Sequence, residues 1–118
     1  MTVLLIDDNK DWLYFWKVWL TEEGLQVVIC VSGADLHELV VVENPDIIVT
    51  DVLMGEVSGE VLCRELKAHE RSMHIPVVLF SSHRRIDEIA SQCNADGFIS
   101  KNVTPAELTG FLRKYVNV

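Results

Sequence analysis

The chain has 118 residues, of which 49% are hydrophobic and 24% charged, and this size and composition fit one globular domain. Ten basic and eighteen acidic residues give a net charge of −8, so we expect no direct binding to a nucleic-acid backbone. The longest apolar runs, such as residues 39–42, are far shorter than the roughly 20 residues that cross a bilayer, so no membrane segment is expected. Three cysteines without a C-x-x-C pair predict reduced, buried thiols and a cytoplasmic location.

Short β-branched runs alternate along the chain with longer segments of helical period. Strands are predicted at residues 3–6, 25–31, 47–50, 76–80 and 97–100. Helices are predicted near residues 9–23, 34–43, 61–66, 84–93 and 104–115. Because the strands are continuously apolar, they indicate a parallel sheet that is covered on both faces. The fold class is therefore α/β, a doubly wound five-stranded parallel sheet with helices on both faces.

The first predicted helix carries a strong aromatic pattern. Its large rings recur at i, i+3, i+4 and i+7, which predicts one buried face made of Trp12, Phe15, Trp16 and Trp19. Three further apolar residues lie off this stripe: Leu13, Tyr14 and Val18. Tyr14 and Val18 are i, i+4 neighbours and could form an exposed partner surface, although scattered exposed apolar residues are common on any protein.

Polar side chains follow four of the five predicted strands, at the point where each strand ends: Asp7 and Asp8, Asp51, Ser81, and Lys101. The carboxyl ends of parallel strands meet at one edge of the sheet, where such folds bind their ligands. Three neighbouring carboxylates repel one another unless a cation neutralises them, and Mg²⁺ prefers such oxygen ligands. An aspartate can attack phosphorus and form an acyl phosphate, while a lysine and a hydroxyl hold the other oxygens. The set contains every part of an aspartyl-phosphate site.

This pattern resembles the receiver domain of bacterial two-component response regulators, including those of the chemotaxis type. The resemblance rests on five site positions in the right order and on the segment 95–99 that leads to Lys101. It covers essentially the whole chain, so residues 1–118 are expected to form one receiver domain. The resemblance implies the flavodoxin-like strand order 2-1-3-4-5.

The family's metal and phosphoacceptor roles fall on four positions of this chain. Asp51 would accept a phosphoryl group from a histidine kinase or a histidine phosphotransfer protein. Asp8, Asp51 and the backbone carbonyl of Leu53 would ligate Mg²⁺ directly, and Asp7 would act mostly through water. The resemblance therefore implies Mg²⁺ as the cofactor.

The family's phosphate-binding and switching roles fall on three further positions. Lys101 would pair with the phosphate, and Ser81 would hydrogen-bond it and move towards it. Phe98 occupies the place of the switching aromatic residue, although plain packing in the core is an equal alternative. The family usually presents its state to partners on the surface of the fourth helix, fifth strand and fifth helix, which can also form a homodimer. The output domain or target protein is not predicted.

The chain departs from the family pattern at positions close to the site. Gly55 stands where proline is frequent, which predicts a looser loop, and Ser82 stands where alanine or glycine is common. Asn102 follows Lys101, where the family often has a cis proline, so Lys101 is held less firmly or the bond is cis at a cost of about 2.5–4 kcal/mol. The Leu53 side chain cannot orient a water molecule towards the acyl phosphate, which predicts a long-lived phosphoryl state.

The resulting prediction is a phosphorylation-dependent signalling switch that catalyses only its own phosphorylation and dephosphorylation. One alternative is a Mg²⁺-dependent phosphohydrolase with an aspartyl nucleophile. Such enzymes typically place a second acid two residues after the nucleophile, where this chain has Leu53. The other alternative is a phosphate-independent adaptor.

Overall fold

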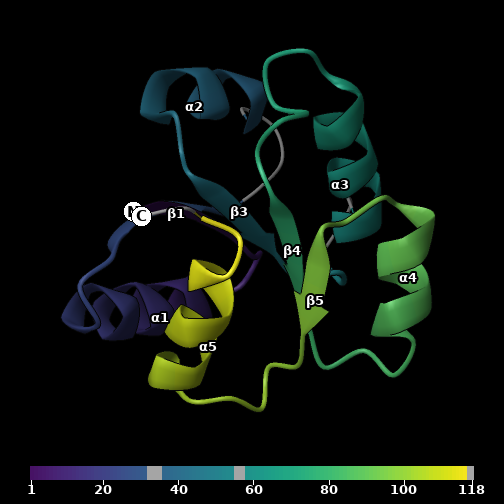
Figure 1. The fold of residues 1–118 in the computed structure, drawn as a ribbon. Coiled ribbons are helices and arrows are strands. Elements are labelled where there is room, and N and C mark those ends of the chain that lie inside the picture. Colours follow the sequence, from purple (N-terminus) through teal and green to yellow (C-terminus); the bar gives the residue numbers. More distant parts are fainter. Residues whose placement is uncertain (32–35, 55–57, 117–118) are drawn as a thin grey trace.

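The computed structural model describes residues 1–31, 36–54 and 58–116, and its elements alternate strictly between strand and helix (Figure 1). The strands are β1 (Thr2–Ile6), β2 (Gln26–Cys30), β3 (Ile47–Thr50), β4 (Val77–Phe80) and β5 (Gly97–Ile99). The helices are α1 (Lys10–Glu22), α2 (Leu36–Glu43), α3 (Gly59–Ala68), α4 (Ile86–Gln92) and α5 (Pro105–Arg113). Each predicted element is present within a few residues of its predicted bounds; the predicted start of the second helix, at residues 34 and 35, lies outside the described residues.

The five strands form one parallel sheet in the order β2-β1-β3-β4-β5, which confirms the predicted topology. The three central strands are apolar almost throughout, and every residue of β3 and β4 is buried. A strand buried on both faces needs helices on both sides, and the sequence supplies them.

Side chains alternate between the two faces of the sheet along each strand, and they belong to two separate hydrophobic cores. On one face Val3, Leu5 and Val49 pack with α1 and α5. On the other face Leu4 and Ile6 pack with α2, α3 and α4. Figure 1 shows the same division, with α1 and α5 together on one side of the sheet.

The register of the central strands decides which polar residues meet at the carboxyl edge. Leu5 pairs with Val49, and Ile6 pairs with Thr50. Continued by one residue, this register places Asp7 beside Asp51, and the backbone N–H of Asp51 donates to the carbonyl of Ile6 at 3.1 Å. Alternation turns both side chains towards the face that α1 and α5 cover.

The buried face of α1 differs from the predicted aromatic stripe. The buried residues are Leu13, Trp16 and Leu20, so Leu13 was wrongly placed off the stripe. Phe15 and Trp19 are 53% and 40% exposed, and the prediction that they belong to the core was wrong. Leu13 and Leu20 set the angle at which α1 packs on the sheet. The larger rings of Phe15 and Trp19 therefore lie outside the buried face of the helix. Tyr14 and Val18 are exposed as predicted.

Local signals fix the ends of the helices that flank the site. Thr104 caps α5 in a reciprocal capping box with Glu107, and Pro105 occupies the first turn, as the sequence predicts. Asn9 caps α1 by accepting from the backbone N–H of Trp12. All three cysteines are buried and none of them is in a disulfide, as predicted. Among the described helices, none is long and apolar enough to cross a membrane.

Candidate functional site

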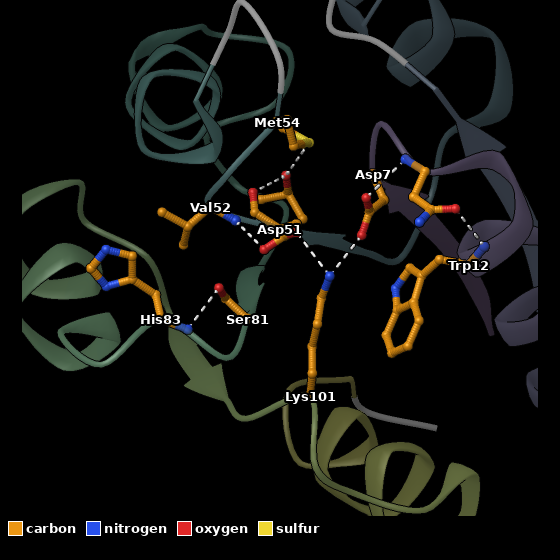
Figure 2. A network of polar contacts seen from close by, with 10 residues as sticks. Asp7, Trp12, Asp51, Val52, Met54, Ser81, His83 and Lys101 are labelled. Carbon is orange, nitrogen blue, oxygen red and sulfur yellow. Dashed lines mark hydrogen bonds and ion pairs between the residues drawn. The ribbon is translucent and has the colours of Figure 1, made fainter.

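Asp7, Asp51 and Lys101 form an ion cluster at the carboxyl edge of the sheet (Figure 2). The Lys101 Nζ lies 2.8 Å from Asp51 Oδ2 and 2.9 Å from Asp7 Oδ2. Asp7 and Asp51 are 2% and 9% exposed. Two carboxylates this close to one another and to the core need a shared cation, and Lys101 supplies it.

The phosphoacceptor candidate Asp51 is anchored by its own backbone as well as by Lys101. Its Oδ1 accepts from the backbone N–H of Val52 at 2.7 Å, which leaves Oδ2 directed at Lys101. Thr50, fully buried, donates its hydroxyl to the Asp51 carbonyl at 3.0 Å. Both oxygens of the carboxylate therefore have a defined direction.

Asp7 and Asp8 have different surroundings although they are adjacent in sequence. Asp7 is buried, and its Oδ1 accepts from the backbone N–H of Asn9 at 3.1 Å, which closes a tight turn into α1. Asp8 is exposed beside it. The structure thus brings two of the three predicted carboxylates onto one lysine and leaves the third on the solvent side.

The environment moves the pKa values of two members of the cluster. Burial raises the pKa of Asp7 above its usual value, although hydrogen bonds from Lys101 and Asn9 oppose this change. For Lys101 burial acts to lower the pKa, but the hydrogen bonds to Asp51 and Asp7 raise it above its usual value. Lys101 is therefore a permanent cation at neutral pH.

Ser81 and Phe98, the two predicted switch positions, lie on the β4 and β5 side of the site. Ser81 is buried, and its Oγ accepts from the backbone N–H of His83 at 3.1 Å (Figure 2). Phe98 is 44% exposed and belongs to neither core, so the alternative of plain core packing is wrong.

Two of the predicted departures from the family pattern have a defined structural outcome. No peptide bond among the described residues is cis, so the bond between Lys101 and Asn102 is trans. Ser82 is exposed and lines a shallow pocket of about 620 Å³ together with Leu53, His83, Arg84 and Arg85. Gly55 lies outside the described residues.

Gly59 is a site residue that sequence reasoning missed. Its backbone N–H donates to the carbonyl of Val52 at 2.8 Å. A β-carbon at this position would overlap the carbonyl oxygen of Asp51 and lie 2.7 Å from its carbonyl carbon. Only glycine lets the first turn of α3 approach the backbone of the phosphoacceptor candidate this closely. The glycine itself is visible in the sequence, but the contact is not.

Trp12 is the second residue whose place in the site was missed. Its ring centroid lies 4.6 Å from the Lys101 Nζ, and the indole is half-buried beside the lysine side chain (Figure 2). The sequence pattern assigned Trp12 to the core stripe of α1, and nothing in the pattern indicated Lys101 as its neighbour.

The donor chemistry of this edge suits Mg²⁺. Asp7 and Asp51 present hard carboxylate oxygens that already share one cation, and Asp8 adds a third carboxylate on the exposed side. Within the described ranges, no group of three or more His, Cys, Asp or Glu side chains that could hold a metal ion is assembled. The fit to Mg²⁺ therefore rests on the neighbouring carboxylates of Asp7 and Asp51. Water and phosphate oxygens would complete the coordination shell of the ion, as is usual for Mg²⁺.

Fold and site together define a doubly wound α/β domain with paired carboxylates and a lysine at the carboxyl edge of its sheet. The sequence profile of the response regulator receiver domain matches residues 3–113. The chain belongs to this family.

Three similar proteins illustrate the range of the family. The transcriptional regulatory protein GltR of Pseudomonas aeruginosa is 28% identical over 109 residues, which are 91% of this chain and 45% of GltR. The sensor histidine kinase TmoS of Ectopseudomonas mendocina is 31% identical over 80 residues, 68% of this chain and 8% of TmoS. The signal receiver domain of a signal transduction histidine kinase from Syntrophus aciditrophicus is 30% identical with a TM-score of 0.84, covering 97% of this chain and 88% of that structure.

These matches establish phosphorylation-dependent signalling in two-component systems as the role of this domain. Receiver domains are signalling switches rather than enzymes with a separate substrate, and they generally depend on Mg²⁺. The chain spans about half the length of GltR and less than a tenth of TmoS.

Proposed function

We propose that this domain receives a phosphoryl group on Asp51 from a phosphohistidine of a histidine kinase or histidine phosphotransfer protein. The observation that supports this most strongly is the Lys101 Nζ held between Asp51 and Asp7, at 2.8 and 2.9 Å. A buried carboxylate with a fixed lysine and a neighbouring carboxylate is poised for nucleophilic attack on phosphorus.

In the transfer, a carboxylate oxygen of Asp51 forms a new bond to phosphorus. The bond from phosphorus to the imidazole nitrogen of the donor breaks, and the leaving imidazole keeps the electron pair. Lys101 stays within reach of the oxygens of the new group and offsets their charge. Val52 continues to hold Oδ1 through its backbone N–H, so the acceptor carboxylate keeps its orientation.

We propose that Mg²⁺ is held by Asp8, Asp51 and the backbone carbonyl of Leu53, with Asp7 acting through water. When bound, the ion supplies positive charge to the phosphoryl oxygens and relieves repulsion among the carboxylates. This assignment gives Asp8, on the exposed side of the edge, a role different from that of the buried Asp7, which contacts Lys101 and Asn9.

Ser81 and Phe98 are proposed to convert the phosphoryl group into a change of surface. The Ser81 hydroxyl would leave its contact with the His83 N–H and bond to a phosphoryl oxygen. Phe98, exposed on β5, has a ring that could then turn inward. The surface of α4, β5 and α5 would report this change to an output domain or target protein, or to a second copy of the chain. We also propose a cytoplasmic setting, to which three buried cysteines outside any disulfide are suited.

Intact mass after incubation with Mg²⁺ and acetyl phosphate tests the proposal. The parent protein is expected to gain one phosphoryl group and the Asp51→Asn variant none, because an amide is not a nucleophile for phosphorus at neutral pH. Asp87→Asn, which changes an exposed acid on α4, is the matched control and is expected to gain the group normally. Addition to Asp51→Asn would assign the acceptor elsewhere. No addition to the parent, either from acetyl phosphate or from a phosphorylated kinase, would favour an adaptor.

A further inference from the structure

The Lys101 ammonium has a third neighbour besides the two carboxylates. Its Nζ lies over the Trp12 ring at 4.6 Å from the centroid, within the range in which an aromatic face attracts a cation. The Lys101 side chain is 19% exposed, so this attraction acts in a partly desolvated place, where it is strongest. Two carboxylates and one indole face thus bound the ammonium.

Trp12 is itself held by the part of the molecule that carries Asp7. The Asn9 side chain accepts from the Trp12 backbone N–H at 3.1 Å, and the Asn9 backbone N–H donates to Asp7 at 3.1 Å. The Trp12 ring packs against Trp16 at 5.5 Å and Phe80 at 6.0 Å between centroids. The indole therefore has little freedom relative to the carboxylates.

Lys101, in contrast, stands on a loop that does little to fix it. Its backbone N–H donates to the Ser81 carbonyl at 3.3 Å, and the residues between β5 and α5 form no regular element. Asn102 follows it through a trans bond, so no proline ring stiffens the chain at this point. The position of the ammonium must come largely from contacts of the side chain.

The contact with Lys101 distinguishes Trp12 from Trp16, its neighbour on the same helix. Among the described residues, the buried Nε1 atoms of both tryptophans have no hydrogen-bond partner, so this feature does not set Trp12 apart. Trp16 is a core residue, 2% exposed, whereas the half-buried Trp12 turns one face of its ring to the Lys101 Nζ. The cation on this face is therefore the feature particular to position 12.

We propose that Trp12 is a positioning residue that holds the Lys101 ammonium over the phosphoacceptor site. The inference rests on the proposed function, in which Lys101 loses an oxygen of Asp51 and gains oxygens of the phosphoryl group. During this exchange the indole face is a contact that does not change. It keeps the ammonium close to the incoming group and excludes water from one of its sides.

The rate of phosphorylation by acetyl phosphate with Mg²⁺, followed by intact mass, is the first test. Trp12→Leu removes the aromatic face and is expected to slow the reaction by about 2- to 30-fold. Trp12→Phe keeps a face and is expected to restore most of the rate. Trp19→Leu is the matched control on the same helix. Trp19 is 40% exposed and packs on Phe15 and Trp16, and its substitution should leave the rate unchanged. Equal rates for parent and Trp12→Leu would overturn the proposal.

A double-mutant cycle separates positioning of Lys101 from a general structural effect. In a Lys101→Ala background, Trp12→Leu is expected to change the rate less than 2-fold, because the contact through which Trp12 acts is already gone. A full loss in this background would show that Trp12 acts through another route and would overturn the proposal. Circular dichroism confirms that each variant is folded. If Trp12→Leu does not fold, the resonances of the Lys101 side chain in the parent protein test the inference.

Nuclear magnetic resonance of the Lys101 side chain tests the contact between Trp12 and Lys101 without any phosphoryl transfer. Protons held over an indole face are shifted upfield, so the terminal methylene and ammonium protons of Lys101 should shift upfield in the parent. The shift should largely persist in Trp12→Phe and vanish in Trp12→Leu. A parent that shows the shift but accepts no phosphoryl group would contradict the proposed function and leave the contact intact. A parent without the shift would overturn the positioning role itself.

Discussion

The two sides of Asp51 differ sharply in how they are built. On one side Asp7, Lys101 and Trp12 are packed together by two ion pairs and an aromatic contact, with Asp7 almost fully buried. On the other side lies the shallow pocket that Leu53, Ser82, His83, Arg84 and Arg85 line. Leu53 there is 66% exposed.

In the proposed function, this difference separates two tasks of the Asp51 carboxylate. The packed side fixes Asp51, the proposed nucleophile, together with its countercharge, which is how preorganised sites act on developing charge. The open side would then admit the phosphodonor and later water, and it carries two exposed basic side chains, Arg84 and Arg85, on a chain of net charge −8. Changes on the packed side should therefore affect how readily Asp51 accepts the phosphoryl group, and changes on the open side should affect how fast the group is lost.

The largest expected effect comes from Gly59, where the first turn of α3 closely approaches the backbone of Asp51. Gly59→Ala would press a β-carbon into the Asp51 carbonyl, so α3 or the acceptor loop must move. We expect a loss of about 3 kcal/mol in the free energy of unfolding, the upper end of the usual cost of overpacking, because backbone cannot yield as a side chain can. Urea denaturation measures it.

Gly110→Ala on α5 is the matched control for this substitution. A β-carbon at Gly110 meets no atom within 4 Å, and alanine is the better helix former, so about 0.5–1 kcal/mol of added stability is expected. Similar behaviour of the two variants would contradict the close approach of α3 to Asp51.

An intermediate effect is expected on the open side, at Leu53. The Leu53 side chain cannot hydrogen-bond water, whereas Leu53→Asn places an amide where a water molecule could be directed at the acyl phosphate. One added hydrogen bond of about 1 kcal/mol in the transition state would speed loss of the phosphoryl group about fivefold. Decay of the phosphorylated mass after removal of acetyl phosphate measures the rate.

Leu53→Ala separates the amide from simple loss of bulk. The alanine variant opens the same space without a polar group, so its decay should stay within about twofold of the parent. If Leu53→Ala decays as fast as Leu53→Asn, access of water rather than its orientation limits the lifetime. If neither differs from the parent, Leu53 does not control the lifetime.

The fold was predictable because its signals are local and repeated. Continuous apolar strands, and a cap such as Thr104 with Pro105 and Glu107, define elements without knowledge of their neighbours. The prediction of the buried face of α1 failed because Trp16 belongs to two overlapping helical patterns. Periodicity alone does not tell the pattern with Leu13 and Leu20 from the one with Phe15 and Trp19.

The site was predictable where it depends on strand ends and not where it depends on packing between distant segments. Asp7, Asp51 and Lys101 follow strands of one parallel sheet, so topology alone brings them together. Gly59 and Trp12 meet their partners through the docking angles of α3 and α1, which no local pattern encodes. Their roles emerge only once the helices are placed on the sheet.

The smallest expected effect concerns the charge that the packed side keeps buried. Because burial raises the pKa of Asp7, the folded state holds its proton more tightly than the unfolded chain does. Stability therefore falls as the pH rises from the ordinary aspartate value near 3.8 through the folded-state pKa, and is level above it. Asp7→Asn has no such proton, so it should gain on the parent across this window, by about 1 kcal/mol or less.

Urea midpoints of parent and Asp7→Asn, measured with a chelator from pH 3.5 to pH 7, test this sign. Asp87→Asn serves as the control, because it removes the same charge from the exposed face of α4 and reports the general benefit of a less negative chain. A parent that gains on Asp7→Asn as the pH rises would mean that Lys101 outweighs burial at Asp7. The ion pairs of Lys101 would then stabilise the packed side. In the expected case, by contrast, the buried Asp7 carboxylate lowers the stability of the fold, and the fold accepts this cost to place Asp7 beside Asp51.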